Sequence, residues 1–119
     1  MGKIILTLGF LAICTYAQEV QAQDSALQQN CLSCHQEHQI PSFLIYKRYL
    51  MKYSTAKRME DAMVIYMKDP GKEHSIMPAP FFLKFPMKVK TDLNEMSLRK
   101  HIQAYLERFD IKKKLMLEE

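Results

Sequence analysis

The sequence has 119 residues, of which 48% are apolar and 25% charged, which is the composition of an ordinary globular domain. The length predicts one domain, and three Gly in the whole chain exclude a collagenous or low-complexity protein. Seventeen Lys and Arg against thirteen Asp and Glu give a formal charge of +4, which is too small for a dedicated nucleic-acid-binding protein.

The N-terminus has the pattern of an export signal. One Lys precedes an apolar run at residues 4–13, which is too short to span a bilayer. Small residues then offer cleavage after Ala17 or Ala22. We therefore expect a signal peptide over residues 1–22 rather than an uncleaved anchor. A mature domain over residues 23–119, with no membrane span, would then act in the periplasm.

The first predicted helix begins at Asp24 or Ser25, because either side chain can cap a helix N-terminus. It ends before Pro41, which cannot continue a helix. Three residues share one face of this helix at spacings of i, i+4 and i+7: Leu27, Cys31 and Cys34.

This helix carries the C-x-x-C-H pattern of covalent c-type haem attachment, in Cys31, Cys34 and His35. Two thiols three residues apart on a helical turn can reach the two vinyl groups of a porphyrin, and the following imidazole can ligate the iron. A thioredoxin-like redox pair would need a βαβ pattern, and a zinc site would need a second pair of ligands. The sequence offers neither. The motif therefore predicts one covalently bound haem c, with His35 as an iron ligand.

With this motif after an export signal, the chain resembles the small single-haem cytochromes c of the class I type that bacteria export. The resemblance implies an all-α, cytochrome c-like fold of three to five helices wrapped around one haem. It also implies His/Met ligation of the iron and one-electron transfer rather than an enzyme activity. Two features depart from the family: Gly71 is the only glycine of the mature domain, and the family's Trp near the haem propionates is missing.

In the family, a Pro shortly after the motif offers its carbonyl oxygen to the Nδ1–H of the proximal His. Such a bond fixes the ring and raises its basicity. Pro41 is the residue in this chain that matches, and its alternative role is simply to end the first helix.

Two further helices are predicted before the next break. The first covers residues 42–53, and the second begins at Ser54 or Thr55 and ends at residues 69–71, Asp-Pro-Gly. Met side chains at helical spacing on these segments are expected to fill the core. Three side chains on the first of them are candidates to bond the haem propionates: Tyr46, Arg48 and Tyr49.

The sixth iron ligand is expected in the next segment, where three prolines from Pro78 to Pro86 predict a loop without regular helix. The resemblance points to Met77, because a Met-Pro pair in an extended loop after the third helix matches the family's distal ligand. A thioether ligand stabilises ferrous iron and raises the reduction potential. Met87, His74 and an open sixth position are the alternatives.

The last helix is predicted to open at Asp92, in a capping box with Glu95. The resemblance places this helix across the first one. The extension at residues 110–119 is either a docking helix or a frayed tail. No strand pattern appears along the chain. The inner stripe of the last helix has five members: Leu98, Ile102, Tyr105, Leu106 and Phe109.

Basic residues gather near the predicted ligand loop at Lys84, Lys88 and Lys90, with no acidic residue between them. A basic rim would steer an acidic redox protein toward the haem edge. We expect a periplasmic carrier of single electrons. The alternatives are the haem subunit of a larger oxidoreductase and a sensor of small gases with an open sixth position.

Overall fold

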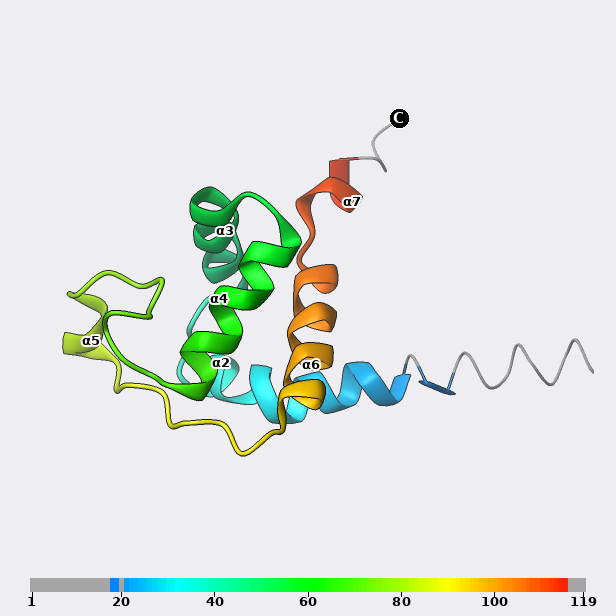
Figure 1. Ribbon diagram of the computed structural model, residues 1–119, viewed down its shortest axis with the longest axis horizontal. Helices are drawn as coiled ribbons and strands as arrows, with labels where there is room; N and C mark the ends of the chain where they lie inside the picture. The colour runs from blue at the N-terminus through cyan, green and yellow to red at the C-terminus, as the bar shows by residue number, and fades with distance from the viewer. Residues whose placement is uncertain (1–17, 20, 116–119) are drawn as a thin grey trace, which may run out of the picture.

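The computed structural model describes residues 18, 19 and 21–115. Most of the predicted signal peptide, with its cleavage site after Ala17, lies outside these residues. The described part is helical and contains no strand, which confirms the predicted all-α class (Figure 1). None of its helices combines the length and the apolar character needed to cross a membrane.

The first helix changes type along its length. Residues 21–27 are α-helical, η1 (Gln28–Leu32) is a π-helical turn, and α2 (Ser33–Glu37) is again α-helical. The π turn is closed by a hydrogen bond from the Ser33 N–H to the carbonyl oxygen of Gln28. The helix was predicted to begin at Asp24 or Ser25. This was wrong, because both residues lie inside the helix rather than at its cap.

The π turn also changes which side chains of the first helix enter the core. Leu27 and Leu32 are 1% and 4% exposed, whereas Cys31 is half-buried and Cys34 is exposed. Residues five apart lie on different faces of an α-helix, but the wider π turn brings them to the same face. The predicted common face of Leu27, Cys31 and Cys34 is therefore replaced by a leucine face.

The second and third helices follow the prediction closely. α3 (Ser42–Tyr53) has Pro41 at its N-cap, and α4 (Ala56–Lys68) begins after Thr55. The Thr55 hydroxyl oxygen accepts a hydrogen bond from the Arg58 N–H at 3.4 Å. Helix α4 ends at Asp69, directly before the Pro-Gly pair, as predicted.

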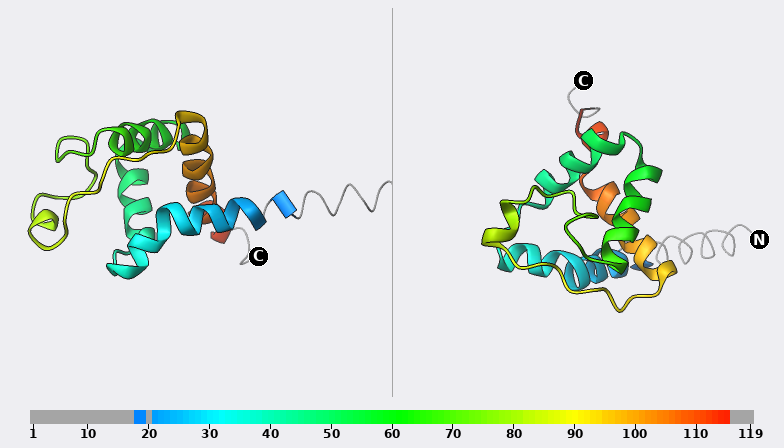
Figure 2. Two further views of the ribbon diagram at one scale, coloured as in Figure 1. Left: turned by 90° about the horizontal axis from the view of Figure 1, so that it is seen from below. Right: turned by 60° about the vertical axis from the view of Figure 1, so that its left-hand side comes forward.

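A long connection over residues 69–94 leaves the end of α4 and returns to the start of the last helix (Figure 1). It contains α5 (Phe81–Lys84), a single helical turn, so the prediction of no regular helix between Pro78 and Pro86 was wrong for these residues. Pro80 occupies the N-cap, where a missing N–H costs no helical hydrogen bond, so this turn is compatible with its prolines. In Figure 2, α3 and α4 lie between this turn and the last helix.

The last long helix is α6 (Glu95–Arg108), and a short α7 (Ile111–Leu115) follows it within the predicted extension. Asn94 caps α6, because its Oδ1 accepts the Ser97 N–H at 2.9 Å. The predicted start at Asp92 was therefore wrong by two residues. Four members of the predicted inner stripe are buried, and Phe109 is half-buried at the C-cap.

The described core joins the first helix, α3, α4 and α6. Its buried apolar members are Leu27, Leu32, Tyr46, Tyr49, Met59, Met63, Val64, Leu98, Ile102, Tyr105 and Leu106. α6 lies across the first helix (Figure 1), where Arg108 forms an ion pair with Asp24 at 3.2 Å and His101 Nε2 lies 3.4 Å from Asn30 Nδ2. The crossing brings α6 onto the helix that carries the motif.

A network of charged side chains joins α6 to α4. The Arg99 guanidinium donates to the buried carboxylate of Glu60 at 2.8 Å, to Asp61 at 2.9 Å and to Glu95 at 3.2 Å. Hydrogen bonds from Lys57 and Arg99 lower the pKa of Asp61, and hydrogen bonds from Lys68 and Arg99 lower that of Glu95. The network fixes α6 against α4.

Candidate haem-attachment site

Two free thiols lie three residues apart on the first helix. Cys31 belongs to η1 and Cys34 to α2, and neither forms a disulfide. Burial raises the pKa of the Cys31 thiol, and the positive charge of Lys88 acts against this shift. The exposed Cys34 and the half-buried Cys31 thus present both sulfur atoms on one stretch of helix.

His35, directly after the second thiol, is half-buried on α2. Its Nδ1 lies 3.1 Å from the hydroxyl oxygen of Ser42, at the first residue of α3. Burial lowers the pKa of His35, and the charge of Lys88 lowers it further. Both effects favour the neutral imidazole, which is the form that ligates a metal ion. With Nδ1 engaged, Nε2 is the nitrogen left for a ligand.

The contact with His35 Nδ1 that was expected from the Pro41 carbonyl is made by the next residue, Ser42. The Pro41 carbonyl accepts the N–H groups of Leu44 at 3.0 Å and Ile45 at 3.3 Å. The carbonyl of an N-cap residue accepts the first hydrogen bonds of its helix, so that of Pro41 is directed along α3. The Ser42 hydroxyl, rather than the Pro41 carbonyl, faces His35 Nδ1.

The residues of α3 offer one polar group suited to a haem propionate. Arg48 is half-buried, and its Nε is fully buried with no hydrogen-bond partner within the described residues. A buried donor of this kind needs an acceptor, and a propionate carboxylate supplies one. Of the other two predicted candidates, Tyr46 donates its hydroxyl to Asp110 Oδ1 at 3.4 Å, and Tyr49 is almost completely buried. The two thiols, His35 Nε2 and the unpaired Arg48 Nε are the kinds of groups that would hold a covalently attached haem.

The candidates for the sixth ligand have different surroundings. Met77 is half-buried, and its N–H donates to the Ser75 hydroxyl at 3.1 Å. Met87 Sδ accepts a hydrogen bond from the Tyr66 hydroxyl at 3.7 Å. His74 Nδ1 lies 3.0 Å from the carbonyl oxygen of Asp69. Within the described residues, Met77 Sδ has no such partner.

Tyr66 ties the two ends of the candidate ligand loop to α4. Besides its contact with Met87, its hydroxyl interacts with the Ser75 side chain and with the backbone of Lys88. Lys88 is in turn close enough to shift the pKa values of Cys31 and His35. Tyr66 therefore fixes both ends of the loop that holds Met77 against α4.

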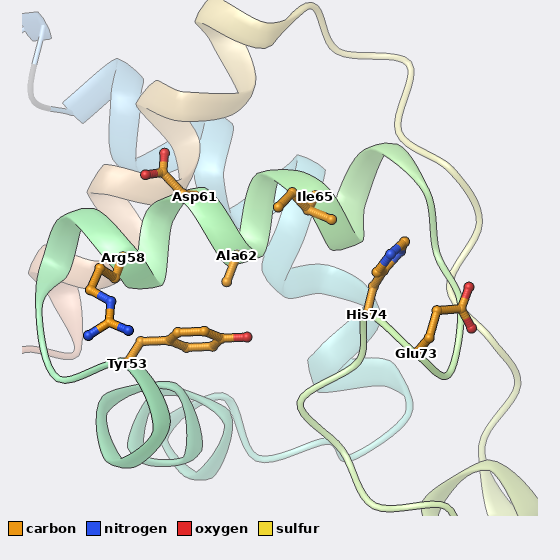
Figure 3. A pocket seen from close by; sticks show the side chains of 7 residues that line it. All are labelled: Tyr53, Arg58, Asp61, Ala62, Ile65, Glu73 and His74. Atoms are coloured by element: carbon orange, nitrogen blue, oxygen red, sulfur yellow. The ribbon is translucent and has the colours of Figure 1, made fainter.

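A surface depression of about 340 Å³ lies along α4, lined by Tyr53, Arg58, Asp61, Ala62, Ile65, Glu73 and His74 (Figure 3). Another, of about 500 Å³, shares Asp61, Ile65 and His74 with it. Neither is lined by the thiols or by His35. Next to them, the ligand atoms of Asp69, Glu73 and His74 lie within 4.8 Å of one another, a grouping that the sequence analysis missed.

Sequence reasoning also missed Ser42. The signal was present, because a hydroxyl residue at the first position of a helix, directly after its N-cap Pro41, points back toward the preceding segment. Of the other two histidines, His38 is exposed and His101 is half-buried. No family model, curated protein or solved structure matches this chain.

Proposed function

We propose that this chain is an exported c-type cytochrome that carries single electrons between redox proteins in the periplasm. The observation that carries the proposal is the Cys31, Cys34 and His35 motif on one helix, with both thiols free and His35 held through Nδ1. Once bound, a haem supplies the reversible Fe(III)/Fe(II) couple. The fold supplies the ligands, the surrounding apolar groups and a surface for partners.

Each residue of the motif has a separate task. Cys31 and Cys34 would form the two thioether bonds, so that the haem would be held covalently. His35 would present the lone pair of Nε2 to the iron, with its ring orientation fixed by the contact at Nδ1. Arg48 would neutralise a propionate through its otherwise unpaired Nε.

Met77 would be the second protein ligand of the iron. Its rivals already have partners, since Tyr66 donates to Met87 and the ring of His74 lies against Asp69. Tyr66 anchors both ends of the loop, so little of the loop has to move when the iron changes its oxidation state. The thioether sulfur favours ferrous iron and raises the reduction potential.

The partner is proposed to be an acidic redox protein. Lys84, Lys88 and Lys90 are exposed, and within the described residues none of them forms an ion pair. Leu83 and Val89, 91% and 82% exposed, stand among these lysines. An apolar tip with a positive rim suits a short-lived complex that buries less than about 1,200 Å².

Haem attachment is tested by expressing the full chain for export in a bacterium that attaches haem c. We expect haem to migrate with the chain under denaturing conditions, and the mass of the product to identify cleavage after Ala17 or Ala22. The double variant Cys31→Ala, Cys34→Ala should lose the covalent haem. The variant Cys14→Ala is the matched control and should keep it. Haem that still migrates with the double variant would refute the attachment.

The carrier is distinguished from a gas sensor by adding carbon monoxide to the reduced protein. A closed six-coordinate iron leaves the absorption spectrum unchanged at neutral pH, whereas rapid binding would favour an open sixth position. Met77→Ala should then allow carbon monoxide to bind and should abolish the Met-to-iron charge-transfer band. Met87→Ala is the control. If Met87→Ala alone had these effects, the ligand would be Met87.

A further inference from the structure

A chain of two hydrogen bonds links α6 to the imidazole of the motif through the start of α3. The buried Tyr105 donates its hydroxyl to the carbonyl oxygen of Ser42 at 2.6 Å. The hydroxyl oxygen of the same Ser42 lies 3.1 Å from His35 Nδ1. The consecutive helices α2 and α3 and the distant α6 thus meet at one serine.

A histidine that ligates a metal through Nε2 carries its proton on Nδ1, and a partner for this N–H fixes the tautomer and the ring orientation. An acceptor at Nδ1 also raises the basicity of the ligand nitrogen. A more basic ligand stabilises Fe(III) relative to Fe(II), so it lowers the reduction potential.

We propose that Ser42 is the positioning residue for His35, and that Tyr105 holds Ser42 in place. The inference rests on the proposed function, because it assigns the partner of the proposed iron ligand. In the ligated state, His35 Nδ1–H donates to the Ser42 oxygen. Ser42 thereby sets the ring orientation and lowers the potential.

Two observations favour Ser42 over the other groups near His35. The Pro41 carbonyl, the acceptor that the resemblance suggested, already accepts two N–H groups of α3. Ser42 is the first residue of a regular twelve-residue helix, and its carbonyl is held by the strongly buried Tyr105. A side chain fixed in this way loses little conformational entropy when it accepts the imidazole N–H.

The test compares Ser42→Ala, Ser42→Thr and Tyr105→Phe in the haem-loaded protein. The midpoint potential and the hydrogen-exchange rate of the His35 Nδ1–H, observed by NMR in the diamagnetic ferrous form, are measured for each. We expect Ser42→Ala to raise the Fe(II)/Fe(III) ratio about tenfold at a fixed ambient potential. For one electron, this corresponds to a rise of about 59 mV in the midpoint potential. Exchange at Nδ1 should accelerate roughly tenfold as well. Tyr105→Phe should shift both readouts in the same direction by less, and Ser42→Thr should restore wild-type values.

Ser25→Ala is the matched control, because the exposed Ser25 hydroxyl donates only to the carbonyl of Ala22. The inference is overturned if Ser42→Ala changes the two readouts no more than this control does. It is also overturned if the potential shifts while Nδ1 exchange stays at the wild-type rate. If Ser42→Ala does not fold, Tyr105→Phe carries the test alone. A wild-type chain without covalent haem would refute the proposed function, whereas covalent haem with unchanged readouts would refute only this inference.

Discussion

Leu98 should be among the costliest side chains of α6 to truncate. It is 2% exposed and packs in the core that joins α6 to the first helix, α3 and α4. Leu98→Ala removes roughly three methylene equivalents, or about 2.4 kcal/mol of transfer free energy, and it leaves a cavity. With the cavity included, we expect the free energy of unfolding to fall by about 3–5 kcal/mol. That is a large part of the roughly 5–15 kcal/mol that stabilises a domain.

The chain contains a matched control for this experiment. Leu83 is 91% exposed on α5, so Leu83→Ala makes the same chemical change without opening a cavity and should alter stability by less than about 0.5 kcal/mol. Urea unfolding followed by circular dichroism measures both variants, with the denaturant slope as a check that the unfolded states are comparable. A loss below about 1 kcal/mol for Leu98→Ala, or equal losses for both variants, would show that α6 is not packed as described.

Two further predictions concern the ends and the charges of α6. Asn94→Ala should reduce stability by about 1 kcal/mol because it removes the cap, whereas Asp92→Ala should have little effect; equal losses in urea unfolding would contradict the assignment of the cap. Arg99→Gln should lower the Tm at neutral pH, because it removes the shared partner of Asp61 and Glu95. Because folding lowers the pKa values of these carboxyls, their charged forms stabilise the fold at any pH above their unfolded pKa values. This contribution is lost as the pH falls through the folded pKa values. The difference in Tm between the variant and the wild type should therefore shrink toward acid pH, and a constant difference from pH 7 to about 2 would refute this origin.

Local sequence signals were sufficient to predict the boundaries of the helices in the middle of the chain. Pro41 and the Ser54–Thr55 pair mark the starts of α3 and α4, and Asp69 with the following Pro-Gly marks the end of α4. Each of these residues restricts its own backbone or satisfies a free N–H, so the boundary is decided by neighbours in sequence. The apolar stripe of α6 was predictable for the same reason.

The predictions of the start of α6 and of the loop around α5 were wrong because the local sequence there is compatible with more than one structure. Asp92 and Asn94 are both good caps, and the choice of Asn94 depends on where α6 can start while it remains packed against α4. A single turn between Pro80 and Pro86 satisfies the rules for proline as well as an irregular loop does. In both cases, packing beyond the reach of the local sequence decides the outcome.

Part of the arrangement of the candidate site could be predicted from the sequence. The positions of the thiols and of His35 follow from the motif alone, because chemistry dictates their spacing. The partner of His35 does not follow from it, because the Pro41 carbonyl and the Ser42 hydroxyl are equally close in sequence. The first turn of α3 decides between these two groups. It directs the Pro41 carbonyl along the helix axis, where the carbonyl accepts helical N–H groups, and it leaves the Ser42 hydroxyl available to His35.

Because of the π turn at Gln28–Leu32, the number of residues in the first helix cannot change without disturbing the candidate site. One residue of an α-helix advances the side chains by about 100°, so deleting one residue from the turn would rotate everything after it by that angle relative to Leu27. Either Leu32 would leave the core, or the two thiols would turn away from the surface they now occupy. The spacing between the core-anchored half of this helix and the C-x-x-C-H motif is therefore as constrained as the spacing within the motif, although no residue in between carries any chemistry.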